Sequence, residues 1–165
     1  MIRAFLALPL PDSIRSALTV QQFLLPVPRK LPPENLHLTL VFMGEVAEPV
    51  LEEAHEGFAA LRMPPFPLRL QGLGLFGGAK PHAVWAGVAP SEPLARLQAK
   101  VERIARTAGC EVQARRFTPH VTLARLRSSR VDDVVHYLSG RGNFRTSPFT
   151  VGRFVLMSSK ESVGG

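Results

Sequence analysis

Apolar and polar residues alternate along this chain with two different periods, and each period predicts one type of element. Short apolar runs and period-two alternation are typical of strands, whereas apolar residues three and four positions apart are typical of amphipathic helices. The patterns predict strands at residues 2–8, 36–42, 68–75, 82–88, 111–116, 120–126 and 147–157. They predict four helices, which begin after the cap residue Asp12, at Pro49, and after the cap residues Ser91 and Ser129. The second ends at Leu61, and Gly109 ends the one that follows Ser91.

The order strand, helix, strand, helix, strand occurs twice, which indicates a duplicated unit. In each copy an apolar strand is followed by a helix and then by a strand that contains histidine. His37 lies 33 positions after Ala4 in the first copy, and His120 lies 37 positions after Ala83 in the second. We therefore expect a single domain over residues 1–165, made of two pseudo-symmetric lobes that each contribute one histidine motif.

The two copies agree best at His37-Leu38-Thr39-Leu40 and His120-Val121-Thr122-Leu123. Residues i and i+2 of a strand share a face, so each motif places its histidine and threonine together and its two aliphatic residues on the core side. A single such motif is typical of an ordinary half-buried strand. Its occurrence twice, at matching places, predicts that two imidazoles and two hydroxyls face one shared cleft.

These groups suit the hydrolysis of a cyclic phosphodiester. The reaction needs a base to activate water and an acid to protonate the departing ribose oxygen, and histidine serves either role near neutral pH. The hydroxyls of Thr39 and Thr122 can donate to phosphate oxygens, and a guanidinium such as Arg125 adds positive charge. In an unbroken strand, however, Arg125 shares a face with Val121, so a bend or bulge is needed to aim it inward.

Charge is unevenly distributed along the 165 residues, which carry a formal net charge of +7. Residues 1–90 are neutral overall, so the whole excess lies in the second half, and sixteen of the twenty basic residues are arginine. Arginine recognises phosphate through its forked donors, which favours a phosphate-bearing partner such as RNA. A solvated surface in an arginine-biased proteome explains the same charge, so charge alone does not decide.

Other function classes are disfavoured by the sequence. Neither histidine motif has the spacing of a known metal site, and a third ligand would have to be His55, His82 or His136. The glycines at 72–78 lack the context of a nucleotide-binding loop, so we expect neither metal nor cofactor. No apolar run approaches the roughly 18–20 residues that span a bilayer. The single cysteine, Cys110, excludes an internal disulfide, and we expect a cytoplasmic protein.

Three aromatic residues lie close to the motifs in the predicted strands, namely Phe5, Phe42 and Trp85. Two interpretations remain open for them. They are either part of the apolar core or a platform on which a nucleobase stacks. Of the three, Phe42 is the candidate for base stacking.

At its motifs the chain resembles the 2H phosphoesterase superfamily, and within it the RNA 2',3'-cyclic phosphodiesterases of the LigT/ThpR type, also described as 2'-5' RNA ligases. The resemblance rests on residues 3–8, 34–40, 42–46, 83–88 and 117–125. It implies a bilobal α/β (α+β) fold in which two mainly antiparallel sheets, with helices outside, surround a V-shaped cleft.

The resemblance also implies metal-independent opening of an RNA 2',3'-cyclic phosphate to a 2'-phosphomonoester. His37 is then the proton donor and His120 the proton acceptor, while Thr39, Thr122 and Arg125 bind phosphate. The two histidines exchange roles if the reaction runs backward as 2'-5' ligation. The expected partner is an RNA with a 2',3'-cyclic phosphate end, with no membrane involved and the protein a monomer.

Two other functions fit parts of the same pattern. A non-catalytic RNA-binding module would keep the cleft and the basic half, although binding alone does not need two paired proton-transfer groups. A phosphodiesterase for a small 2'-5' or cyclic nucleotide would share the chemistry and differ in substrate length. A steep salt dependence of binding to longer RNA would argue against the small substrate.

Overall fold

The computed structural model describes residues 1–27, 30–77, 82–126 and 131–159. Each half of the chain has the order strand, helix, strand, helix, strand, strand. The first half contains β1 (Ile2–Pro9), α1 (Asp12–Leu24), a 3-10 turn η1 (Pro33–Asn35), β2 (His37–Val46), α2 (Glu48–Ala60), β3 (Phe66–Leu68) and β4 (Leu70–Phe76). The second half contains β5 (Ala83–Val88), α3 (Glu92–Ala108), β6 (His120–Arg125), α4 (Val131–Ser139), β7 (Phe149–Val151) and β8 (Val155–Ser159).

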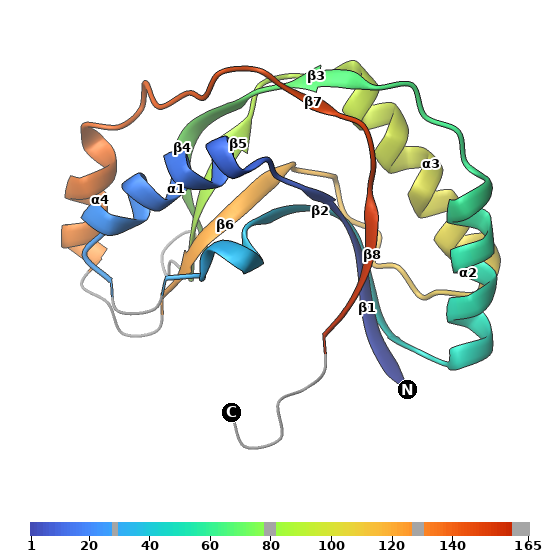
Figure 1. Ribbon diagram of the computed structural model, residues 1–165. Coiled ribbons are helices and arrows are strands. Elements are labelled where there is room, and N and C mark those ends of the chain that lie inside the picture. The colour runs from blue at the N-terminus through green and yellow to red at the C-terminus, as the bar shows by residue number, and fades with distance from the viewer. Residues whose placement is uncertain (28–29, 78–81, 127–130, 160–165) are drawn as a thin grey trace.

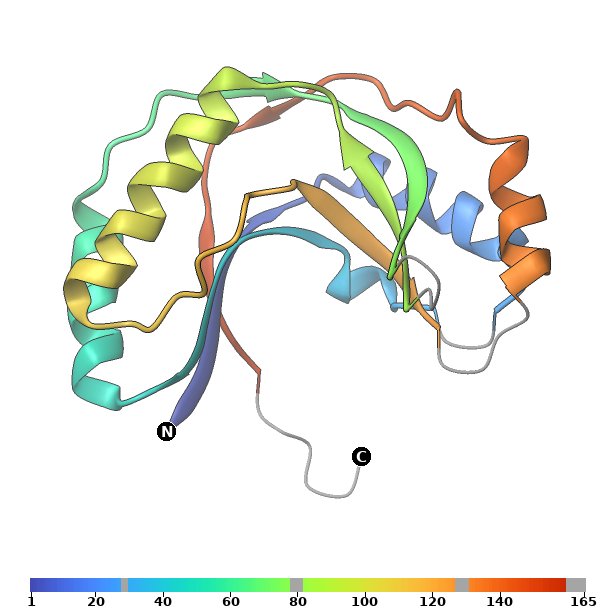
Figure 2. The same ribbon diagram turned by 180° about the vertical axis from the view of Figure 1, so that it is seen from behind.

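Two three-stranded antiparallel sheets form the centre of the molecule. One has the strand order β2-β1-β8 and the other β4-β5-β6, while β3 and β7 pair separately. The strands β2 and β6 are edge strands of their sheets and lie side by side, as both views indicate (Figures 1 and 2). The expected α+β class with antiparallel sheets and outer helices is confirmed.

The helices pack at the two ends of the molecule, with the strands between them (Figures 1 and 2). At one end α2 packs against α3, which also lies against β2. At the other end the Tyr137 hydroxyl of α4 donates to the Gln21 carbonyl of α1, and α1 lies against β6. Each histidine strand is therefore covered by a helix from the other half of the chain.

The helix α3 begins and ends where its sequence predicts. The Ser91 hydroxyl accepts a hydrogen bond from the Leu94 amide, and Gly109 ends the helix with a φ of 108°, which glycine adopts without a Cβ clash. A buried stripe runs along one face. The predicted cap and stop of this helix are confirmed.

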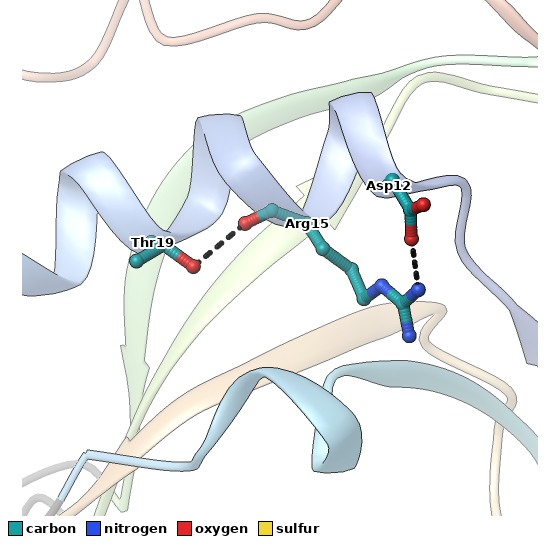
Figure 3. A network of polar contacts seen from close by, with 3 residues as sticks. All are labelled: Asp12, Arg15 and Thr19. Carbon is teal, nitrogen blue, oxygen red and sulfur yellow. Dashed lines mark hydrogen bonds and ion pairs between the residues drawn. The ribbon is translucent and has the colours of Figure 1, made fainter.

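The start of α1 differs from the prediction. Asp12 is the first helical residue, and Pro11 occupies the cap position without a side-chain hydrogen bond. The Asp12 carboxylate instead pairs with Arg15 one turn later, and the Thr19 hydroxyl donates to the Arg15 carbonyl (Figure 3). Because the pair is exposed, it contributes only about 0.2–1 kcal/mol. Ser129, the expected cap of α4, and Gly78, the last of the glycines at 72–78, lie outside the described residues.

Two predicted strands were wrong. Residues 111–116 form no strand, because all but Val112 are exposed and too little apolar surface is available to hold the segment on a sheet. The strand predicted over 147–157 is divided at residues 152–154. Its first part, β7, pairs with β3, and its second part, β8, pairs with β1. Local alternation is the same in both parts, so only the pairing distinguishes them.

Candidate active site

Both histidine motifs begin a strand at the junction between the sheets. His37 is the first residue of β2, and His120 is the first residue of β6. The two histidines and the two threonines, Thr39 and Thr122, are half-buried. The aliphatic residues between and after them, which are Leu38, Leu40, Val121 and Leu123, are buried in the core. The alternation predicted for both motifs is thus present on two adjoining edge strands.

A β-bulge interrupts each of these strands at the same place in its motif. On β2, Thr39 pairs with Ala7 and Val41 pairs with Leu6, which leaves Leu40 as the extra residue. On β6, Leu123 is the extra residue between the pairs Thr122–Trp85 and Ala124–Val84. Two consecutive residues of each strand are consequently buried, Leu40 with Val41 and Leu123 with Ala124.

The bulges change which later residues lie on the histidine side of each strand, the face that carries its histidine and threonine. After two buried positions, alternation resumes at the fifth residue past each histidine, which is Phe42 on β2 and Arg125 on β6. Both are exposed, and Phe42 is 67% accessible. The structure therefore contains the bulge that Arg125 needs in order to lie on the same face of β6 as Thr122. The exposure of Phe42 excludes the interpretation of this residue as core.

His37 is held mainly by aromatic packing. Its ring stacks on Phe5 of β1, with centroids 5.1 Å apart and an angle of 24° between the planes. Phe5 in turn contacts Phe42 at a centroid distance of 6.0 Å, so three rings follow one another across β1 and β2. Burial lowers the pKa of His37, because desolvation penalises the imidazolium. Its Nδ1 atom is enclosed and has no hydrogen-bond partner among the described residues.

His120 is held by a hydrogen bond. Its Nδ1 lies 2.8 Å from the carbonyl oxygen of Thr118, and the edge-to-face ring of Phe76 lies 4.7 Å away. A carbonyl oxygen only accepts, so Nδ1 carries the proton and Nε2 of the neutral ring keeps its lone pair. In this arrangement the Nε2 lone pair of the neutral ring is able to accept a proton.

The contact from Phe76 was not anticipated by the sequence analysis. Phe76 also packs on Trp85 of β5, with centroids 5.3 Å apart, and Trp85 lies against Gly74 and Gly87. A Cβ atom on Gly74 would fall 2.3 Å from the indole ring, so only glycine leaves room for Trp85 there. The sequence did contain one indication of this packing. Gly74 and Phe76 are two positions apart in a predicted strand, so they share the face that contacts Trp85.

The three residues expected to bind phosphate lie on the two histidine strands. Among the described residues, no hydrogen bond or ion pair is found for Thr39, Thr122 or Arg125. Arg115 and Arg116 are also exposed, in the segment that leads to β6. Exposed arginines thus lie both before and at the end of the second histidine strand.

Metal ligation has no support within the described ranges. No group of three or more His, Cys, Asp or Glu side chains that could hold a metal ion is found there. The three remaining histidines, His55, His82 and His136, are all exposed. A cavity of about 410 Å³ lies between α2 and the start of β8 and is lined by His55, but it includes neither motif. Within the same ranges, no helix is long and apolar enough to cross a membrane.

The chain is similar in sequence to a family of known proteins. The profile of the 2'-5' RNA ligase superfamily matches residues 10–162. An Aeropyrum pernix protein named RNA 2',3'-cyclic phosphodiesterase is 43% identical over 99 residues, which cover 59% of this chain and 56% of that protein. An Archaeoglobus fulgidus protein of the same name is 30% identical over 169 residues, which cover 94% of this chain and 92% of that protein. The chain thus spans little more than half of the Aeropyrum protein and nearly all of the Archaeoglobus protein.

The fold is also similar to solved structures. The apo crystal structure of Escherichia coli LigT superposes with a TM-score of 0.79 at 27% identity, covering 99% of this chain and 91% of that chain. LigT has also been crystallised with 3'-AMP and with phosphate. Since both the profile and the structural match extend over most of its length, this chain belongs to the 2'-5' RNA ligase superfamily.

Proposed function

We propose that this protein hydrolyses RNA 2',3'-cyclic phosphodiester ends to 2'-phosphomonoesters, without a metal ion. The observation that carries the proposal is the placement of His37 and His120 at the starts of two adjoining edge strands, each followed by a threonine on the same face and by the same bulge. The curated relatives named RNA 2',3'-cyclic phosphodiesterase support this substrate class.

In the proposed reaction His120 is the base and His37 is the acid. Nε2 of His120 takes a proton from water as the water oxygen forms a bond to phosphorus. The bond from phosphorus to the ribose 3' oxygen breaks, and His37 gives its proton to that oxygen. The products are a 2'-phosphate and a free 3'-hydroxyl, and solvent restores both imidazoles. The hydrogen bond of His120 Nδ1 to the Thr118 carbonyl supports its role as base.

Three side chains are proposed to bind the phosphate and one to bind the base. The hydroxyls of Thr39 and Thr122 and the guanidinium of Arg125 donate to the non-bridging oxygens, whose negative charge increases in the transition state. Phe42 stacks on the terminal nucleobase through its exposed ring.

We further propose a single domain of two pseudo-symmetric lobes, which acts as a monomer in the cytoplasm. The burial of Cys110, the only cysteine, supports a protein without intermolecular disulfides.

The test is hydrolysis of a short RNA with a 2',3'-cyclic phosphate end, in EDTA, with the product terminus identified. We expect a 2'-phosphate product, and we expect turnover to be lost in both His37→Ala and His120→Ala. A matched control is His136→Ala, which removes an exposed histidine on α4 and is expected to leave turnover unchanged.

Each other outcome counts against a specific part of the proposal. Turnover that requires added zinc would contradict the metal-free mechanism. RNA binding without turnover of any cyclic phosphate would favour the binding module. Turnover of small cyclic nucleotides alone, with weak binding of longer RNA, would favour the small-nucleotide phosphodiesterase.

A further inference from the structure

Each bulge is contacted by a glutamine that comes from the helix covering its strand. On α1, Gln22 is only 4% exposed, and its side-chain amide donates to the carbonyl of Leu123 at 2.9 Å. On α3, the Gln98 amide donates to the carbonyl of Leu40 at 3.2 Å. Leu123 and Leu40 are the extra residues of the two bulges. The same chemical group thus reaches the same motif position on both strands.

The contact has a clear physical reason. The extra residue of a bulge is unpaired with the neighbouring strand, so its buried carbonyl takes donors from outside the sheet. The carboxamide of Gln22 has two N–H donors, and it also donates to the Leu31 carbonyl at 2.8 Å. The Leu31 amide in turn donates to Leu123 at 3.0 Å. Gln22 therefore joins α1, the segment at residues 30–31 and the bulge of β6.

The position of the bulge decides where two proposed substrate contacts point. If β6 continued without an extra residue, Arg125 would share a face with Val121 and Leu123, both of which are buried. The same holds for Phe42 on β2, which would follow Leu38 and Leu40 into the core. A one-residue change of phase reverses every later side chain of a strand. Holding the bulge in place therefore keeps Arg125 and Phe42 on the histidine side.

We propose that Gln22 and Gln98 are positioning residues that hold the two β-bulges, and thereby orient Arg125 and Phe42 on the faces that carry the His–Thr pairs. The consequence for catalysis rests on the function proposed above. Gln22 has the larger effect, because it is buried and makes two hydrogen bonds, whereas Gln98 is half-buried and makes one. Neither residue belongs to a motif, and Gln22 lies 101 positions from the carbonyl it contacts.

The test replaces each glutamine by methionine, which has a similar length and no N–H donor. We expect Gln22→Met to lower kcat/KM for the cyclic-phosphate RNA about ten- to a hundredfold, the size of effect that a small misplacement produces. In an Arg125→Ala background the same change is expected to have almost no further effect. Likewise, Gln98→Met is expected to raise KM in the wild type and not in Phe42→Ala.

A control separates positioning from stability. Thr146→Val removes another buried hydrogen bond between a side chain and the backbone, from the Leu70 amide to the Thr146 hydroxyl at 3.1 Å. It is expected to lower Tm while leaving kcat/KM unchanged at a temperature well below unfolding. An equal loss of kcat/KM in Thr146→Val would overturn the positioning role. The positioning role would also be overturned if the losses of kcat/KM in Gln22→Met and Arg125→Ala multiplied in the double variant.

A second readout does not depend on activity. Amide hydrogen exchange at Leu31 is expected to accelerate in Gln22→Met, because that amide donates to the carbonyl that Gln22 holds. Unchanged exchange would contradict the proposal. A wild-type protein without turnover would refute the proposed function alone, and the exchange rates would then decide the role of Gln22. If Gln22→Met does not fold, the kinetic test uses Gln98→Met instead. KM is then compared among Gln98→Met, Phe42→Ala and the double variant.

Discussion

The imidazole of His37 stacks on the ring of Phe5, with 5.1 Å between the centroids and 24° between the planes. His120, by contrast, is anchored through Nδ1 to a backbone carbonyl and meets an aromatic ring only by its edge. Two motifs with nearly the same sequence thus place their histidines in different surroundings. Under the function proposed above, this difference supports different proton-transfer roles for two histidines that the symmetry of the motifs leaves equivalent.

The pKa of His37 is expected to depend on Phe5. Burial holds this pKa below its ordinary value of 6.5, so removing the ring in Phe5→Ala admits water and raises the pKa toward 6.5. An NMR titration of the His37 ring protons measures the change directly. Phe23→Ala is the matched control, because Phe23 is 81% exposed on α1 and is expected to leave the titration of His37 unaltered. A pKa that stays equally low in Phe5→Ala would mean that other groups bury His37.

Phe76 is expected to support the orientation of His120. An edge-to-face ring contact contributes about 0.5–1.5 kcal/mol beyond its buried area, so Phe76→Leu is expected to lower kcat about two- to tenfold. Steady-state kinetics on the cyclic-phosphate RNA provide the measurement, with KM expected to change less than kcat. A change confined to KM would instead place Phe76 in substrate binding.

Phe42 is expected to contribute to RNA binding through base stacking. Alanine substitution at a stacking position costs about 1–3 kcal/mol per base, so Phe42→Ala is expected to raise KM for the RNA about five- to 150-fold, with little effect on kcat. Phe23→Ala removes an even more exposed phenylalanine and serves as the control. Equal KM values for the wild type and Phe42→Ala would remove Phe42 from the substrate site.

Gly74 is expected to be essential for the packing of Trp85. In Gly74→Ala the added Cβ would lie 2.3 Å from the indole, so the ring must move, and overpacking of this kind costs about 1–3 kcal/mol. Gly142→Ala is the control, because nothing lies within 4 Å of the added Cβ there. Urea denaturation of both variants compares their free energies of unfolding. Equal stability would show that Trp85 relocates without cost.

The sequence by itself determined the features that depend on neighbouring residues. The order of the helices and most strands follows from periodicity, because backbone geometry repeats every two or 3.6 residues. The Ser91 cap and the Gly109 stop involve hydrogen bonds and dihedral angles within one turn of α3. The shared face of each His–Thr pair follows in the same way from two adjacent peptide units.

Only the tertiary structure decided the features that depend on pairing between distant segments. Residues 111–116 and 147–157 alternate like strands, yet the first is mostly exposed and pairs with no strand, and the second divides between two partners. The register of β2 on β1, and of β6 on β5, creates the bulges that return Phe42 and Arg125 to the histidine side. Strand register and the contacts of Gln22 and Gln98 join residues far apart in the chain. No local periodicity encodes them, because they are set by how the whole core packs.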